Sequence, residues 1–291
     1  MTGTANGHFQ PDGQAYPPAG RAAPGHGGRP ALGTQGEKSL ARLIHDEIIP
    51  RLVQAHGSPR VGPVDPIGPR DIESLARRVL SEHSWTLLAD IDRWLDAGVD
   101  VASVLLDLLA PAARRLGEFW DEDSVDFVDV AMGMWRLQEL VHAIAQRRPG
   151  MAPDPGSPRR ALFAPVPGER HCFGALVVEE LFHRAGWTTV GARPDTRAAL
   201  LAAVGDRCFD MVGLSCSCDR FVPDLCGLVA AIRRTARNPA LIVMVGGPVF
   251  ATAPDLAEDI GADLTAQDGA QAVALCNARL AAVRHATALV A

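Results

Sequence analysis

The sequence Ala161-Leu-Phe-Ala-Pro-Val166, followed by Glu169-Arg-His-Cys-Phe-Gly174, predicts a strand, a loop and the start of a helix. The first part is a short apolar run, typical of a buried strand, and an amphipathic run follows the second part. His171 therefore lies on a strand-to-helix loop at the carboxyl edge of a sheet, where open α/β folds bind ligands. Its imidazole is a candidate metal ligand that Glu169 can orient, and Gly174 lets a planar group approach the backbone.

The same alternation of apolar runs and helical patterns continues along the chain. Strands are predicted at 161–166, 188–193, 211–216, 241–246 and 262–266, and helices at about 173–186, 196–206, 222–236, 254–260 and 269–287. Five apolar strands, each followed by a helix, indicate a doubly wound α/β domain with a five-stranded parallel sheet, at residues 160–288.

The first half of the chain is predicted to be helical or irregular. Residues 70–148 have helical periodicity throughout, and four helices with short connections indicate an all-α bundle. A further helix is predicted at residues 37–56, from its single apolar stripe. Residues 1–36 contain nine Gly and five Pro, so we expect a disordered tail there. Gly- and Pro-rich linkers are expected at 57–69 and 149–158.

The bulk composition excludes several classes of protein. Of the 291 residues, 47% are apolar and 21% are charged, and the net charge of -6 argues against a broad DNA-binding surface. No apolar run approaches the ~18 residues of a membrane helix. The first residues lack a basic-then-apolar signal sequence, so we expect a cytoplasmic protein. Six cysteines do not make a disulfide framework in a chain of this length, which favours a reducing compartment.

The loop after the first strand resembles a known signature. Glu169-x-His171-x-x-Gly174 is similar to the D-x-H-x-x-G motif of cobalamin-binding domains, with Glu in place of the usual Asp. The resemblance implies that His171 becomes the lower axial ligand of cobalt and displaces the dimethylbenzimidazole tail of the cofactor.

Two further matches to that family follow in the same order along the chain. Ser215-Cys-Ser217 ends a strand where the family has S-x-L, and Gly246-Gly247 ends the next strand where the family has G-G. The resemblance implies that the cofactor tail lies beside these serines and glycines. Read from the residues alone, the serines are small groups bonded to the backbone at a strand end, and the glycines form a turn.

The helical bundle contains candidates for a cap over the upper face of cobalamin. Trp120 closes an L-G-x-x-W segment, which in the family supplies a Trp over the corrin ring. Met132, Trp135 and His142 share a face of the next helix, where core packing is the alternative role for the Met and the Trp. The Glu-His pair that relatives often have about ten residues after the Trp is absent. We therefore predict that His142 is the upper ligand or covers the upper face.

The segments 132–142 and 44–50 resemble the AerR/PpaA group of photosynthesis-gene regulators, over about residues 37–285. This resemblance implies a cobalamin-dependent, light-responsive antirepressor that binds a PpsR/CrtJ-type repressor rather than an enzyme. The helix at 37–56 is expected to contact that protein, with DNA contacted only through the complex. The alternatives are a corrinoid carrier protein of a methyltransferase system and a haem-binding sensor. Helical caps of such light sensors often self-associate, so a homo-oligomer is a further alternative.

The cysteines near the predicted site could bind zinc or sense redox state. Cys216 and Cys218 lie at a strand end with Cys172 and Cys226 nearby, but no complete Cys/His quartet has structural-zinc spacing. We therefore do not predict a structural zinc site and leave a redox role open. The motifs of dinucleotide-binding enzymes, P-loop NTPases and α/β-hydrolases are absent, and Ser215 stands where a phospho-receiver needs an acid.

Overall fold

The computed structural model describes residues 66–290, with side chains to residue 285. The predicted tail at 1–36 and the predicted helix at 37–56 lie outside the described residues. Within residues 66–290, no helix combines the length and the apolar character that crossing a bilayer requires.

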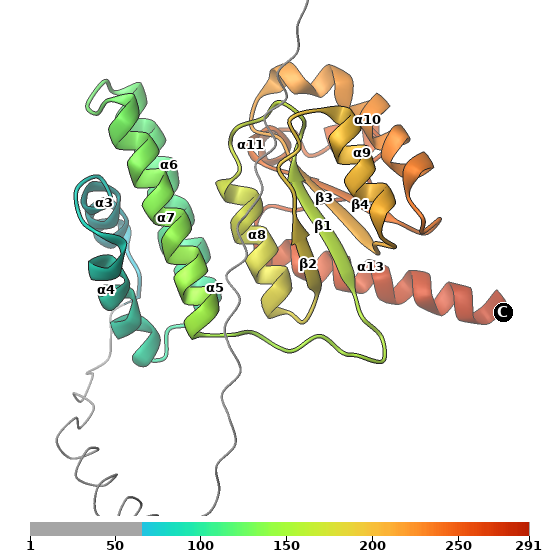
Figure 1. Cartoon of the computed structure of the whole chain (residues 1–291), viewed down its shortest axis with the longest axis horizontal. Helices are drawn as coiled ribbons and strands as arrows, with labels where there is room; N and C mark the ends of the chain where they lie inside the picture. The colour runs from blue at the N-terminus through green and yellow to red at the C-terminus, as the bar shows by residue number, and fades with distance from the viewer. Residues whose placement is uncertain (1–65, 291) are drawn as a thin grey trace, which may run out of the picture. The chain divides into compact units, whose positions relative to one another are not determined.

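The predicted helical bundle precedes the sheet (Figure 1). Its helices are α3 (Pro69–Arg78), α4 (Ser84–Asp96), a continuous run of α5 (Val101–Ser103), η2 (Val104–Leu109) and α6 (Ala110–Asp121), and α7 (Phe127–Arg147). Asp100 and Asp126 begin the third and fourth of these helices, because their carboxylates accept the N–H groups of Ala102 and Asp129. The segment η2 is a π-helical turn whose apolar side chains are almost all buried in the bundle core.

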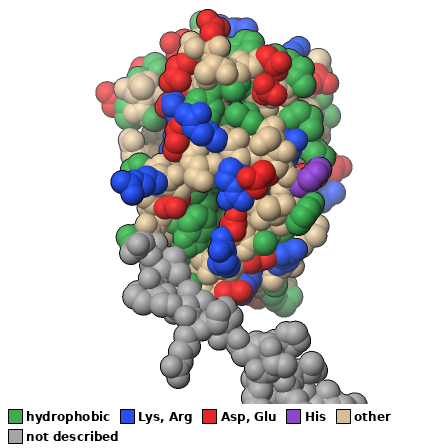
Figure 2. All heavy atoms as spheres, turned by 90° about the vertical axis from the view of Figure 1, so that its left-hand side faces the viewer, with side chains coloured by type: hydrophobic (Ala, Val, Ile, Leu, Met, Phe, Trp, Pro, Cys, Tyr) green, Lys and Arg blue, Asp and Glu red, His purple; other side chains and the backbone are tan. Residues whose placement is uncertain are grey.

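The exposed face of the bundle is stabilised by ion pairs. Arg78 contacts both Glu82 and Asp90 at 2.7 Å, and Arg115 contacts Glu73 at 2.7 Å. Figure 2 shows positive and negative side chains intermixed on this face of the molecule. Such a surface offers no extended region of one sign for binding nucleic acid.

The second half of the chain is the predicted five-stranded parallel sheet. The strands are β1 (Arg160–Pro165), β2 (Thr188–Gly191), β3 (Met211–Ser215), β4 (Ile242–Gly246) and β5 (Leu264–Thr265). Their order is β2-β1-β3-β4-β5, and every neighbouring pair is parallel. The doubly wound fold class is therefore confirmed, with strand boundaries close to the predicted ones.

Helices cover both faces of this sheet (Figure 1). They are α8 (Phe173–Arg184), α9 (Arg197–Asp206), η3 (Asp219–Phe221), α10 (Val222–Thr235), α11 (Pro248–Thr252), α12 (Leu256–Asp259) and α13 (Gly269–Val290). The helices α8 and α13 pack on one face, while α9 and α10 pack on the other. On α8, Val177 and Leu181 belong to the bundle core and Phe182 belongs to the sheet core. This helix therefore joins the bundle to the sheet.

One predicted helix differs from the structure. The stretch predicted as a helix at 254–260 contains only α12, and α11 was not predicted. The chain enters α11 directly from Gly247, with Pro248 at its first position, where a proline fits a helix well. Pro254 then separates the two short helices, because proline disfavours a helical conformation in the residue before it.

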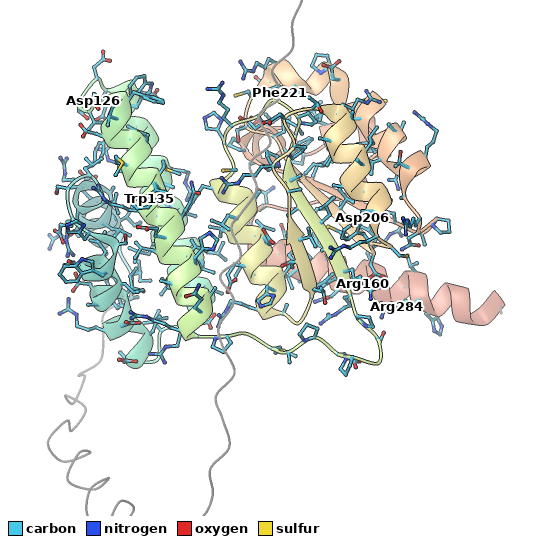
Figure 3. All side chains as sticks on the ribbon, in the orientation of Figure 1. Asp126, Trp135, Arg160, Asp206, Phe221 and Arg284 are labelled. Atoms are coloured by element: carbon cyan, nitrogen blue, oxygen red, sulfur yellow. The ribbon has the colours of Figure 1, made fainter. Side chains whose placement is uncertain are left out.

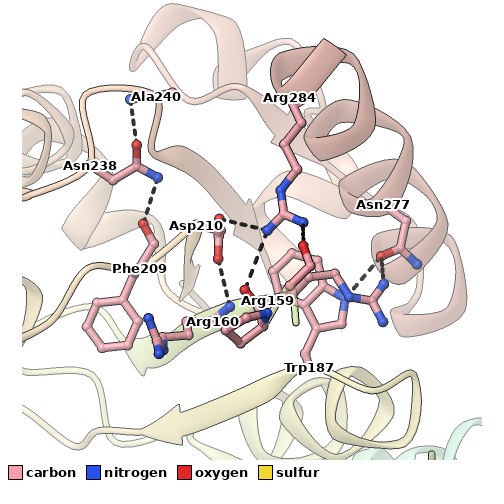
Figure 4. Close-up of polar contacts among 11 residues, drawn as sticks. Arg159, Arg160, Trp187, Phe209, Asp210, Asn238, Ala240, Asn277 and Arg284 are labelled. Atoms are coloured by element: carbon pink, nitrogen blue, oxygen red, sulfur yellow. Dashed lines mark hydrogen bonds and ion pairs between the residues drawn. The ribbon is translucent and has the colours of Figure 1, made fainter. Parts of the chain in front are cut away.

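Polar contacts anchor α13 at the amino edge of the sheet (Figure 4). Arg284 contacts Asp210 at 3.4 Å, and Asn277 accepts hydrogen bonds from Arg159 and from the indole N–H of Trp187, at 2.7 and 3.0 Å. The opposite, carboxyl edge carries the predicted site residues.

Candidate functional site

The strand order creates a switch point at the carboxyl edge of the sheet. From β1 the chain leads to β2 on one side, whereas β3 and the later strands lie on the other side. The loops that leave β1 and β3 therefore diverge, and open α/β folds bind ligands between such loops. His171 lies on the first of these loops, and Ser217 and Cys218 lie on the second.

The carboxylate of Glu169 connects the two loops. Its side chain is only 1% exposed, and its Oε1 accepts hydrogen bonds from the backbone N–H groups of Arg170 and His171, at 2.8 and 3.1 Å. Its Oε2 accepts the backbone N–H of Ser217 at 3.0 Å. Burial alone would raise the pKa of Glu169, but the hydrogen bonds from His171 and Ser217 lower it below its ordinary value. The carboxylate is therefore ionised at neutral pH.

The imidazole of His171 is held in the orientation that a metal ligand needs. Its Nδ1 lies 2.6 Å from Glu169 Oε1, and 70% of its side chain is exposed. An ionised carboxylate only accepts hydrogen bonds, so in the neutral imidazole Nδ1 carries the proton and the lone pair lies on Nε2. A buried carboxylate that fixes the tautomer of an exposed imidazole is a common arrangement behind metal-ligating histidines.

The predicted serine and glycines lie together beside this loop. Ser215 of β3 pairs with Gly246 of β4, and Ser215 Oγ is buried without a hydrogen-bond partner among the described residues. A Cβ at Gly246 or at Gly174 would meet nothing within 4 Å, so both positions leave space for a ligand. Gly247 differs, because its φ is 107° and a Cβ there would lie 2.4 Å from the Cys216 carbonyl oxygen. The fold itself requires Gly247.

The predicted cap residues lie exposed in the bundle. Trp120, Met132 and Trp135 are 47%, 39% and 53% exposed, so core packing does not account for them. Phe127 and Val128, which the sequence analysis missed, extend this group, and the Phe127 ring contacts Trp120 edge to face. We call these five side chains the cap surface. An exposed apolar cluster of this kind marks a site for a ligand or a partner.

The cap surface continues on α7 towards the α/β domain. Trp135 lies midway along α7 (Figure 3) and shares a helix face with Gln138 and His142, since three and four residues separate them. Gln138 accepts a hydrogen bond from Arg193, which follows β2, at 3.2 Å. This face of α7 is therefore directed at the α/β domain.

His142 lies near the second half of α8. Burial raises the pKa values of Glu179 and Glu180 there, and nearby groups, His142 among them, partly offset this effect. His171, in contrast, precedes the first turn of α8. The predicted role of His142 at the upper face of a cofactor remains a prediction.

Cys218 lies beside the Glu169–His171 pair. Its Sγ, a carboxylate oxygen of Glu169 and a ring nitrogen of His171 all lie within 4.8 Å of one another. The sequence analysis noted this thiol only with other cysteines and missed its actual neighbours. The available signal was that the loops after β1 and β3 must meet at a switch point.

Comparison with known proteins identifies the class of the second domain. Residues 159–276 match the family model of the B12 binding domain. The predicted membership of these residues in the cobalamin-binding domain superfamily is therefore confirmed.

A curated relative and a solved structure extend the similarity to the bundle. The chain is 26% identical over 178 residues to an uncharacterised 20.5 kDa protein in the bchF-crtJ intergenic region of Rhodobacter capsulatus. This alignment covers 61% of this chain and 92% of that protein. The monomethylamine corrinoid protein of Methanosarcina barkeri aligns at a TM-score of 0.56 and 15% identity, over 71% of this chain and 96% of that one. The latter similarity shows that the two proteins share a fold.

Proposed function

We propose that this chain is a cobalamin-dependent, light-responsive regulator that acts by binding a transcriptional repressor, and that it is not an enzyme. The observation that supports cofactor binding most directly is the Glu169–His171 pair at the switch point, with Nε2 free for a metal. The match of residues 159–276 to the B12 binding domain supports cobalamin over haem as the cofactor.

The residues at the carboxyl edge suit the cofactor. His171 would ligate cobalt through Nε2, with Glu169 holding the imidazole from the opposite side. The cofactor tail would pass Gly246 and offer a polar partner to the buried Ser215 hydroxyl, which has none among the described residues. Burying an unpaired hydroxyl costs about 1–3 kcal/mol, so a ligand that pairs with it gains this free energy.

The cap surface provides the response to light. Bound cobalamin supplies a cobalt centre whose upper bond is sensitive to light. Trp120, Met132 and Trp135 would cover the upper face, and His142 is proposed as an upper-face ligand or as part of this cover. If bound cobalamin contacts the cap surface differently in the dark and after illumination, illumination changes the relative populations of two cap positions. The shift changes the surface available to a partner.

The repressor is proposed as the partner for two reasons. The AerR/PpaA resemblance implies a PpsR/CrtJ-type repressor, and the name of the region that holds the Rhodobacter capsulatus relative includes crtJ. Residues 37–56 are the proposed contact, with DNA reached only through the complex.

Repressor binding by the full-length chain tests the regulatory role. The affinity for a purified CrtJ-type repressor is compared in the dark and after illumination, with adenosylcobalamin bound and without it. We expect the affinity to change on illumination only when cobalamin is bound. Deleting residues 37–56 should weaken repressor binding and leave cobalamin binding intact. Equal affinity in every state would refute the regulatory role.

A corrinoid carrier protein for a methyltransferase is the second candidate. The fold shared with the monomethylamine corrinoid protein favours it. Transfer of a methyl group from cobalt-bound methyl to a thiol acceptor, with a partner enzyme present, would support this candidate over the regulator.

A further inference from the structure

We propose that Glu169, His171 and Cys218 form a second kind of site, which binds a divalent transition-metal ion such as Zn²⁺ in the cobalamin-free protein. We call these residues the ion trio. Free ion and cobalamin then compete, because both use His171. The ion site stands on the geometry of the trio, whereas the competition also rests on the proposed function.

The geometry of the ion trio is close to that of a bound ion. Its ligand atoms already lie within 4.8 Å of one another, although the residues come from loops after two different strands. Bonds of about 2.0–2.3 Å in a tetrahedral site place ligand atoms about 3.3–3.8 Å apart. Binding therefore replaces the hydrogen bond between His171 Nδ1 and Glu169 Oε1, and it moves the ligand atoms by roughly 1–1.5 Å. Cys218 is half-buried and His171 is 70% exposed, so an ion can reach both side chains from solvent.

The ligand chemistry favours zinc and its neighbours over magnesium or calcium. One thiolate, one imidazole and one carboxylate form a mixed S, N and O set, and three protein ligands leave a fourth position open for water. The Glu169 carboxylate is already ionised, and its Oε2 accepts one hydrogen bond in the described part of the chain, from Ser217. The Cys218 thiol gives up its proton on binding, because the thiolate is the ligand.

Two other thiols serve as comparisons. Cys216 is fully buried, and its Sγ contacts the Cys218 carbonyl oxygen at 3.4 Å. Burial raises the pKa of the Cys216 thiol, which disfavours its thiolate. Cys226 is exposed on α10 and does not belong to the trio. Cys218 is therefore the thiol that the structure assigns to the ion.

Titration of the cobalamin-free, full-length protein with Co²⁺ tests the ion site. Co²⁺ reports thiolate coordination through a sulfur-to-cobalt charge-transfer band and reports geometry through its visible bands. We expect one ion per chain with thiolate coordination, and displacement by Zn²⁺. In Cys218→Ser the charge-transfer band should vanish and the affinity should fall roughly 10- to 100-fold. Cys226→Ser should behave as wild type. Equal Co²⁺ affinity and spectra in wild type and Cys218→Ser would overturn the ion site.

A second titration separates this inference from the proposed function. Hydroxocobalamin is added to metal-free wild type, to Zn²⁺-loaded wild type and to Cys218→Ser with Zn²⁺ present. We expect zinc to slow or weaken cobalamin uptake by wild type and to affect Cys218→Ser far less. Zinc without effect on wild type would overturn the competition. Failure of metal-free protein to retain cobalamin, together with Cys218-dependent Co²⁺ binding, would sink the proposed function and leave the ion site standing.

Discussion

Replacing Glu169 by glutamine tests how the site is held together. The carboxylate accepts four hydrogen bonds, from the backbone N–H groups of Arg170, His171 and Ser217 and from His171 Nδ1. Glutamine has the same length but a single acceptor oxygen, and its NH₂ group must face at least one of these donors. The substitution therefore removes the negative charge and at least one hydrogen bond, with little change in volume.

The expected cost follows from these contacts. One lost hydrogen bond to a charged group contributes about 1.5–3 kcal/mol, and the remaining bonds become weaker because they lose the charge. We expect Glu169→Gln to lower the free energy of unfolding by about 2–4 kcal/mol. Loss of the group that orients a metal-ligating histidine should also weaken cobalamin binding roughly 10- to 100-fold.

Two assays measure these effects. Urea unfolding at neutral pH gives the change in stability, and titration with hydroxocobalamin in the dark gives the change in affinity. Glu258→Gln, at an exposed position on α12, is the matched control and should change neither quantity. The reasoning is refuted if Glu169→Gln unfolds and binds cobalamin as the wild type does.

Four further substitutions test other parts of the account. Gly246→Val should leave the stability nearly unchanged and abolish cobalamin retention. Gly247→Ala should lower the free energy of unfolding in urea by about 2 kcal/mol or more, because of its positive φ. Equal stability losses in the two variants would contradict this distinction. Burial raises the pKa of Glu180 above 4.5, so its contribution to stability is present at acid pH and is lost as pH rises through the raised pKa. Thermal unfolding of Glu180→Gln should therefore show a gain over wild type at pH 8 that disappears near pH 4, and an unchanged pH dependence would count against it. Trp135→Ala should weaken cobalamin binding without lowering the melting temperature, since the side chain is 53% exposed; a large drop in that temperature would assign it a role in the core.

Local patterns in the sequence predicted much of the fold and part of the site. Strands β1, β3 and β4 are short, mostly apolar runs, and each run is complete within a few residues of the chain. The link between Glu169 and His171 spans two residues, so the motif alone was sufficient to predict it.

Contacts between distant segments were harder to predict. The hydrogen bond from Ser217 to Glu169 and the approach of Cys218 to the same pair depend on how two loops meet at the switch point. The exposure of Phe127 depends on tertiary packing, because helical periodicity does not distinguish a core face from an uncovered apolar face. The short helix α11 could have been predicted from the sequence, since Pro248 suits the first position of a helix.

The absorption spectrum of the purified protein with hydroxocobalamin in the dark, beside that of His171→Ala, tests the central claim most directly. The account predicts that the wild type retains the corrin through gel filtration with an altered spectrum. His171→Ala should lose the corrin or return its spectrum to that of the free cofactor. Equal retention and identical spectra for both proteins would contradict the assignment of His171 as the cobalt ligand, and no retention by either would contradict the cobalamin site itself.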